Sequence, residues 1–225
     1  MEVKLTVPAK YIAALKLFTA EKDIRYYLNG ICLEIGRTES RIVATNGHML
    51  GCFRVVSDQP DIDKPLTSIC IASDLLKHIK PAGDVEFVIG APVSDTDGRR
   101  EVRITYAGLS IAGHTTDARY PDWRRVIPDK VSGESAQFNP EYIGRLAKAW
   151  ACLHGKKNPL VGIGYNGQEC ALIGLQDSDF IGAIMPISTG YVAIPSARPD
   201  WVSDFALGYA KPEQAETVAD CEMAA

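Results

Sequence analysis

Residues 5–15 read Leu-Thr-Val-Pro-Ala-Lys-Tyr-Ile-Ala-Ala-Leu, an apolar strand that runs directly into the start of a helix. A proline suits this point because the first helical N–H groups have no partner within the helix. The same plan returns at residues 68–79 and at residues 136–146. Ser73 and Asn139 are the expected N-caps of the second and third helices. One plan recurring at similar intervals predicts a chain built from repeated units.

Strand-like segments follow each expected helix. Asn46-Gly47 and Asn166-Gly167 lie between two such segments, as hairpin turns do. The sequence therefore predicts an α+β fold of repeated strand-helix-strand units. We expect strands at 26–35, 40–45 and 48–56 in the first unit, at 85–89, 102–106 and 109–114 in the second, and at 160–165, 169–176 and 179–187 in the third.

The charge balance limits the kinds of partner. The 225 residues include 24 basic and 28 acidic side chains, for a formal net charge of −4. A protein that binds nucleic acid over its whole surface is usually basic, so only a local basic face is compatible with this balance. The expected helices carry more basic than acidic side chains. These cations are either simply the polar side of amphipathic helices or a face that contacts phosphate groups loosely. The cations concerned are Lys10, Lys16, Lys77, Lys80, Arg145 and Lys148.

No sequence pattern in the chain indicates a catalytic site, a metal site or a cofactor site. The six cysteines have no C-x-x-C spacing, and they are expected to be buried free thiols of a reducing compartment. None of the four histidines carries the signature of a nucleophile or a metal partner. The first residues lack an apolar signal-peptide core, and no apolar run is long enough to span a membrane. We therefore expect a non-enzymatic cytoplasmic protein.

Three stretches go beyond generic pattern. They are Asp-Ile-Arg-Tyr-Tyr-Leu-Asn-Gly at 23–30 with Arg-Ile-Val-Ala-Thr-Asn-Gly-His-Met-Leu at 41–50, then Asp-Ala-Arg-Tyr-Pro-Asp-Trp-Arg-Arg-Val-Ile-Pro at 117–128, and finally Ala-Ile-Met-Pro-Ile at 183–187. Together they resemble the DNA polymerase III beta subunit, the bacterial sliding clamp. The first two resemble that family's middle domain and its junction with the C-terminal domain, in the same order and at similar spacing.

The resemblance implies the DNA-clamp fold, in which helices lie on one face of antiparallel sheets and line the hole of a ring. It also implies sequence-independent contact with duplex DNA, in which phosphates are bound without base readout. Under this resemblance the helix cations become DNA-contacting candidates, and Tyr26 and Tyr27 join them because they match a family loop that approaches DNA.

The family also has a pocket between its middle and C-terminal domains, where polymerases and clamp loaders insert a short peptide. Its apolar residues suit such a ligand, although the alternative for several of them is plain core. Carried over by position, the pocket falls on Leu28, Thr45, Gly47, His48, Leu50, Pro121, Arg125, Val126, Ile184, Met185, Pro186 and Ile187. Asn46 stands where the family pattern has an Asp, and Met49 stands where it has an Arg. Because that Arg is lost, the resemblance does not carry over the detailed specificity of the pocket.

The resemblance suggests a shortened clamp, because it begins at the family's middle domain. We expect a middle-domain-like region of two repeats at 1–122, a C-terminal-like region of one repeat at 123–189, and an extension with a disordered acidic tail at 190–225. Ring closure would then need a homo-oligomer of three or four chains. The alternative is an interaction module or decoy that binds clamp partners without encircling DNA. The extension is a candidate cover for the pocket or for an exposed sheet edge.

Overall fold

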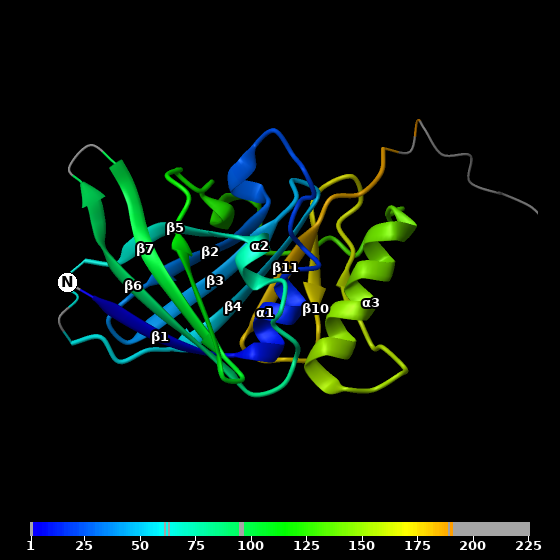
Figure 1. Ribbon diagram of the computed structural model, residues 1–225. Helices are drawn as coiled ribbons and strands as arrows, with labels where there is room; N and C mark the ends of the chain where they lie inside the picture. Colours follow the sequence, from blue (N-terminus) through cyan, green and yellow to red (C-terminus); the bar gives the residue numbers. More distant parts are fainter. Residues whose placement is uncertain (1, 61, 63, 95–96, 189, 191–225) are drawn as a thin grey trace, which may run out of the picture. The chain divides into compact units, whose positions relative to one another are not determined.

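The computed structural model describes residues 2–60, 62, 64–94, 97–188 and 190. These residues form two antiparallel sheets and three α-helices (Figure 1). The α+β prediction is thereby confirmed. Residues 191–225 of the expected extension lie outside the described residues, so its predicted disorder and its covering role stay predictions.

The smaller sheet has four strands. Its order is β1-β6-β7-β8, and alternate side chains of β1 and β6 are buried, as expected for strands with one face on the core. The β7–β8 turn places Ala107 and Gly108 both at positive φ, the backbone shape that a tight hairpin of this hand requires. The strands are β1 (Val3–Pro8), β6 (Asp84–Ser94), β7 (Asp97–Tyr106) and β8 (Leu109–His114).

The larger sheet has seven strands in the order β5-β2-β3-β4-β11-β10-β9. Its central strands are buried on both faces, so they read as nearly continuous apolar runs. The strands are β2 (Gly30–Ile35), β3 (Glu39–Thr45), β4 (Met49–Val56), β5 (Leu66–Ala72), β9 (Gly162–Gly164), β10 (Ala171–Gly174) and β11 (Phe180–Ile184).

The first two repeats exchange their first strands. Strand β1 opens the first repeat but pairs with β6 of the second, and β5 opens the second repeat but pairs with β2 of the first. Each sheet therefore needs both repeats, which explains why the repeat recurs in the sequence as a pair. Only the third repeat lacks such an exchange within the described residues.

The predicted first strand of the third repeat, residues 136–138, is not a strand. The first strands of the other two repeats each pair with a strand of the partner repeat. Residues 136–138 have no such partner strand among the described residues. The segment is held instead by side chains and one backbone bond. Phe138 packs against Tyr165 at a ring distance of 5.9 Å, and Gln137 accepts a hydrogen bond from the Ile187 N–H at 2.7 Å.

The third repeat joins the first through one strand pair. Strand β11 pairs antiparallel with β4, and Gly182 lies directly opposite Gly51 at the centre of this pair. A Cβ on Gly51 would lie 3.1 Å from the Phe18 ring, so the glycine lets the segment after α1 pack closely on the joint. The sheet thus continues across the expected boundary between residues 122 and 123, and the division into those two regions stays a prediction.

The helices are α1 (Ala9–Leu15), α2 (Ser73–Leu76) and α3 (Pro140–His154), with 3₁₀ turns η1 (Tyr26–Leu28) and η2 (Trp123–Val126). Asn139 caps α3 as predicted, because its side chain accepts from the Glu141 N–H at 2.9 Å. The expectation that Ser73 caps α2 is wrong. Ala72 takes that position, and the Ser73 hydroxyl is buried with no hydrogen-bond partner among the described residues.

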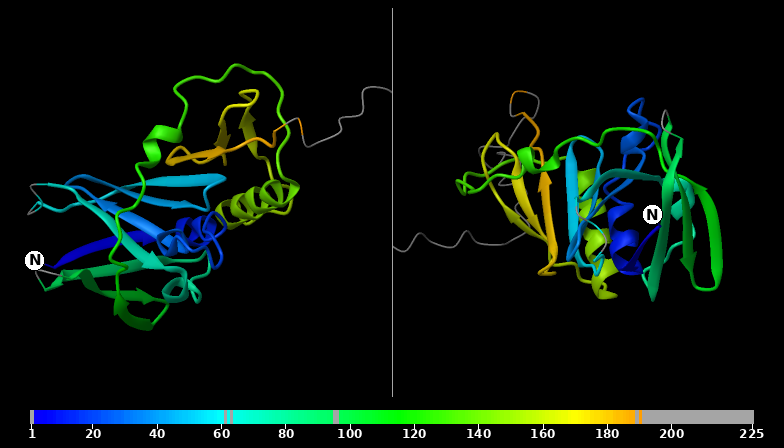
Figure 2. Two further views of the ribbon diagram at one scale, coloured as in Figure 1. Left: turned by 90° about the horizontal axis from the view of Figure 1, so that it is seen from above. Right: turned by 90° about the vertical axis from the view of Figure 1, so that its left-hand side faces the viewer.

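The main core lies between the two sheets and under the helices. Helix α1 packs against α3, and their apolar sides meet residues of both β4 and β11. Figure 2 shows the connection from residue 115 to residue 139 crossing one side of the larger sheet, while α3 lies along the other. In the described parts of the chain, no helix is long and apolar enough to cross a membrane.

Candidate functional site

A cavity of about 390 Å³ opens beside the β4–β11 joint, on the side of the sheet away from α3. Its walls come from η1, the β3–β4 hairpin, η2 and β11. Most of its surface is apolar, and two exposed side chains, Val126 and Met185, stand at its rim. Eight of the twelve residues predicted for a pocket line it: Leu28, Thr45, Gly47, His48, Leu50, Pro121, Val126 and Met185.

Four predicted residues, Arg125, Ile184, Pro186 and Ile187, do not line this cavity. Strand alternation explains Ile184: its neighbours Ala183 and Met185 face the cavity, while Ile184 is fully buried in the main core on the opposite face. A prediction that applied the period of two along β11 would have chosen Ala183 instead.

The β3–β4 hairpin shapes one wall. The Asn46 side-chain oxygen accepts from the backbone N–H groups of His48 and Met49, both at 2.9 Å. Gly47, at φ +89°, supplies the left-handed backbone that this turn needs. An amide oxygen makes the same two bonds as a carboxylate would, and burying it costs less than burying a charge. Replacement of Asp by Asn at this position therefore leaves the turn intact.

The floor of the cavity is a second, smaller core. Leu28, Leu50 and Trp123 pack there over Cys52 and Tyr120. The Tyr120 hydroxyl is buried without a hydrogen-bond partner among the described residues, and burial raises the pKa of this phenol well above its usual value. Burial also raises the pKa of the Cys52 thiol to about 12. Both groups stay neutral, so the floor is uncharged.

The rim carries the polar groups. Arg25 forms a two-pronged pair with Asp23, with Nη2 to Oδ2 at 2.8 Å and Nε to Oδ1 at 3.0 Å. Hydrogen bonding from Arg25 lowers the pKa of the Asp23 carboxyl to about 2. The ring of His48, a lining residue, also stacks on Tyr142 of α3 at 5.7 Å, which ties the β3–β4 hairpin to that helix. The cavity is thus an apolar hollow with a cation and a histidine among its lining residues.

Several lining residues were missed by the sequence prediction. Tyr27 was assigned to DNA contact, but it lines the cavity and its ring meets Tyr120 edge-on at 6.4 Å. Trp123 lies between two predicted residues, so its position in the same short motif was an available signal. No signal marked Cys170, which comes from the loop before β10. The full set of missed residues is Arg25, Tyr27, Met49, Asp122, Trp123, Cys170 and Ala183.

The helix cations differ in how far they are engaged. The Lys16 ammonium donates to the carbonyl oxygens of Leu76, Lys77 and Ile79 at 3.1, 3.4 and 3.2 Å, so it caps the end of α2. Burial lowers the pKa of Lys16. This contact gives Lys16 a structural role, and its predicted contact with DNA stays a prediction.

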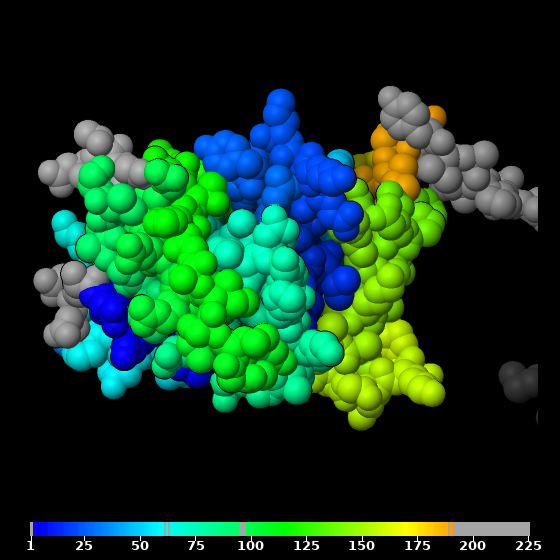
Figure 3. Space-filling model, in the orientation of Figure 1, coloured from blue at the N-terminus to red at the C-terminus, as the bar shows by residue number. Residues whose placement is uncertain are grey.

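Arg145 is also engaged, through Glu141 at 2.9 Å and Glu21 at 3.6 Å. It lines a shallow hollow between the end of α1 and α3, together with Lys16 and Lys148. The surfaces of these two segments border each other in Figure 3. Lys77, Lys80 and Lys148 are exposed. Lys148 lies in α3, whereas α2 ends at Leu76, so Lys77 and Lys80 lie in the segment after it and not in a helix as expected.

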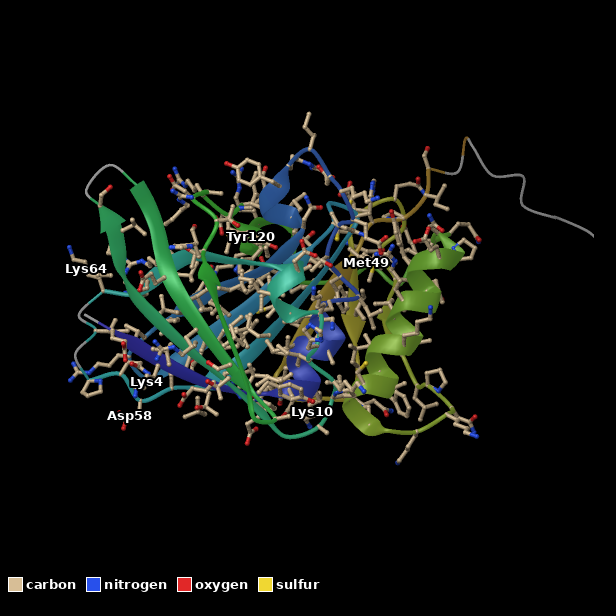
Figure 4. The ribbon with its side chains drawn as sticks, in the orientation of Figure 1. Lys4, Lys10, Met49, Asp58, Lys64 and Tyr120 are labelled. Carbon is tan, nitrogen blue, oxygen red and sulfur yellow. The ribbon has the colours of Figure 1, made fainter. Side chains whose placement is uncertain are left out.

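Lys10 and Tyr26 lie apart from the cavity. The Lys10 ammonium sits 5.4 Å from the Tyr11 ring centre, and Figure 4 shows Lys10 well separated from Met49 and Tyr120. The Tyr26 hydroxyl donates to the Asp117 carbonyl at 3.2 Å, which ties η1 to the connection that follows β8.

Metal ligation finds no support in the described ranges, where no cluster of three His, Cys, Asp or Glu side chains is placed to hold an ion. Cys32, Cys52 and Cys70 are buried free thiols, as expected, whereas the free thiols of Cys152 and Cys170 are only partly buried, contrary to the expectation. Cys32 lies directly opposite Cys70 across β2 and β5. The neighbouring Cys70 thiol and burial both raise the pKa of Cys32. Cys221 lies outside the described residues.

No protein-family model matches the chain. Curated relatives do: it is 31% identical over 136 residues to the beta sliding clamp of Pseudomonas putida and 30% identical over 134 residues to that of Escherichia coli K12. These alignments cover 57% and 56% of this chain and 34% of each relative. The aligned part thus spans about a third of the length of the curated relatives.

Solved structures give the same fold. A sliding clamp from Pseudomonas aeruginosa, solved with a ligand, superimposes with a TM-score of 0.60 at 18% identity, covering 82% of this chain and 66% of that one. A DNA polymerase III beta subunit from Thermotoga maritima gives a TM-score of 0.58 at 15% identity, covering 82% and 65%. The chain is therefore a relative, in sequence and in fold, of the bacterial DNA polymerase III beta subunit, the beta sliding clamp.

Proposed function

We propose that this protein is a non-enzymatic, sliding-clamp-like processivity factor that contacts duplex DNA without sequence preference and binds partner peptides in the cavity beside the β4–β11 joint. The observation that carries the proposal is that eight residues, carried over from the family resemblance, line one apolar cavity of about 390 Å³. Polymerases and clamp loaders of the cytoplasm are the expected partners, and no cofactor is expected.

The shape of the cavity suits a short peptide. Its apolar floor accepts one or two apolar side chains, and its rim offers Arg25 for a peptide oxygen. Met185 contributes a flexible, exposed side chain, which suits several related ligands. The predicted residues Arg125, Pro186 and Ile187, which lie just outside the cavity, are then candidates for contacts with the ends of a longer peptide.

DNA contact rests on the exposed cations Lys77 and Lys80, which follow α2, and Lys148 of α3. The remaining candidates are Lys10, Lys16, Arg145 and the two tyrosines Tyr26 and Tyr27. A test should spare Lys16, since charge reversal there would also uncap α2. We expect the pair Lys77→Glu and Lys80→Glu to weaken binding to a labelled duplex and to reduce the slope of log K against log salt by about two.

The matched control is the pair Lys4→Glu and Lys64→Glu. Both lysines are exposed and lie near the N-terminal end of β1, away from the helices (Figure 4). The two pairs change the net charge equally. An equal loss of DNA binding in both pairs would mean that overall charge, not the helix face, decides binding, and it would contradict the proposed DNA face.

Assembly into a homo-oligomer is part of the proposal. Among the described strands, β8 pairs on one side only, and it carries no Lys, Pro or acidic residue to protect that edge. Such an edge favours pairing with another chain. Light scattering at several protein concentrations tests this: a stable trimer or tetramer supports a ring, and a concentration-independent monomer contradicts it.

The alternative function is a module that binds clamp partners without encircling DNA. One observation favours it: Lys16 and Arg145, two of the candidate DNA-contacting cations, are held by intramolecular contacts, whereas eight of the twelve predicted pocket residues line one cavity. A monomer that binds peptide but shows no difference between the two lysine pairs would select this alternative.

A further inference from the structure

The wall of the cavity formed by η2 has little local structure of its own. Pro121, Asp122, Trp123 and Val126 all line the cavity, yet they belong to a long connection between β8 and α3. Connections of this kind lie on the surface and are mobile unless contacts hold them. A stable wall therefore needs contacts between this connection and the sheet.

The side chain that does so is Glu34 of β2. Its Oε1 accepts from the Trp123 indole N–H at 3.0 Å and from Arg124 Nη1 at 3.1 Å, and its Oε2 accepts from Arg124 Nη2 at 2.6 Å. The Glu34 side chain is only 16% exposed. The Arg124 guanidinium also lies over the Trp123 ring, at 4.4 Å from its centre. One carboxylate thus binds two consecutive residues of the wall.

A β-bulge lies beside Glu34. The β2–β5 register shifts between Leu33 and Ile35, so Glu34 lies where β5 carries an extra residue. Within that irregular stretch Ser68 adopts a positive φ of +59°, and its hydroxyl accepts from the Tyr120 N–H at 3.1 Å. Glu34 and the bulged Ser68 therefore hold the connection at two neighbouring points of the sheet. Bulges are common beside binding sites.

We propose that Glu34 is a positioning residue for peptide binding, which sets the η2 wall of the cavity through its bonds to Trp123 and Arg124. The inference rests on the proposed peptide-binding function. Glu34 does not line the cavity, so it acts on the ligand only through η2. Without this carboxylate, Trp123 and Val126 lose the constraint that keeps the wall at its distance from Leu28 and Leu50.

The test compares Glu34→Ala with Glu39→Ala. Glu39 is an exposed acid of the neighbouring strand that pairs with Arg41 and Arg54 but contacts no part of the wall. The probe is a fluorescein-labelled hexapeptide with two leucines and one phenylalanine, and its control carries serine at those three positions. We expect Glu34→Ala to weaken binding of the apolar peptide about tenfold and Glu39→Ala to leave it within twofold, measured where both variants are folded.

A second readout is independent of any peptide. Arg124 and Arg125 are both exposed sites for trypsin. We expect limited digestion after these residues to be several-fold faster in Glu34→Ala than in the native protein or in Glu39→Ala. A general loss of stability would instead speed cleavage at all sites together. Should Glu34→Ala not fold, Arg124→Lys replaces it, because lysine cannot make the two-pronged pair.

The outcomes separate the two proposals. Unchanged affinity and unchanged cleavage in Glu34→Ala would overturn the role of Glu34. Faster cleavage after Arg124 and Arg125 together with weaker peptide binding supports it. If the native protein does not distinguish the apolar peptide from the serine control, the proposed peptide function fails, while the cleavage rates still decide whether Glu34 holds the wall.

Discussion

Phe53 of β4 and Phe180 of β11 lie directly opposite each other across the joint between the first and third repeats, with ring centres 4.9 Å apart. Phe53 also stacks on Tyr11 of α1 at 4.1 Å. This aromatic group ties the sheet, the joint and the first helix together, and the candidate cavity opens on the other side of the same strand pair.

Phe180→Ala should therefore destabilise the protein by about 3–4 kcal/mol, because it removes a buried aromatic ring and leaves a hole in the joint. Denaturant unfolding followed by circular dichroism measures the change. Ile181→Ala is the matched control. Ile181 is the next residue of β11, its side chain is 36% exposed, and we expect its replacement to lower the free energy of unfolding by less than about 1 kcal/mol. An equal decrease in the free energy of unfolding in both variants would contradict a particular contribution of the Phe53–Phe180 pair to stability.

Lys16→Met should cost about 1–2 kcal/mol of stability, because the three carbonyl oxygens at the end of α2 lose their charged donor while the aliphatic stem is kept. Hydrogen exchange should report the loss mainly at residues 76–80. Lys77→Met is the control: Lys77 is exposed and directly follows α2, so its replacement should leave the free energy of unfolding nearly unchanged. A neutral Lys16→Met would mean that water replaces the ammonium without cost.

Tyr120→Phe should stabilise the protein by up to about 1 kcal/mol, since the buried hydroxyl has no partner to lose. For a chain of this size the expected rise in Tm is about 2–4 °C per kcal/mol. Differential scanning calorimetry measures it. A clear destabilisation would show that the hydroxyl is bonded after all, for example to a buried water.

The Asp23–Arg25 pair gives a prediction on pH. The pKa of Asp23 is lowered in the folded protein, so the contribution of the pair is complete above the ordinary carboxyl value of 3.8 and is lost as the pH falls through about 2. NMR titration of the Asp23 carboxyl carbon should give a midpoint near 2. Arg25→Ala should return that midpoint toward 3.8, and a midpoint unaffected by the substitution would contradict the pairing.

The sequence predicted those parts of the fold that depend on local rules. The strand at 109–114 was predicted to the residue, and the Asn-Pro start of α3 and the turns at Gly47 and Gly167 follow from capping and turn chemistry alone. The missing strand at 136–138 depends on the absence of a partner hairpin in the described residues. Local sequence carries no information on that point.

The cavity was predicted in outline through a resemblance in short motifs. Leu28, Leu50 and Val126 come from three separate segments, and only the known family pattern links them before the fold is seen. The alternation along β11 could have replaced Ile184 by Ala183. The role of Glu34 could not be foreseen, because it depends on a connection that crosses the sheet some 90 residues later.

The most direct test of the account is binding of the labelled apolar hexapeptide to the native protein and to two matched variants, followed by fluorescence anisotropy. Met185→Glu puts a charge at the cavity rim, whereas Val56→Glu puts one at a position of the same sheet that is 84% exposed and outside the cavity. We predict that Met185→Glu weakens binding at least about tenfold and that Val56→Glu leaves it unchanged. Equal binding by all three proteins, or equal binding of the serine control peptide, would contradict a partner-binding role for this cavity.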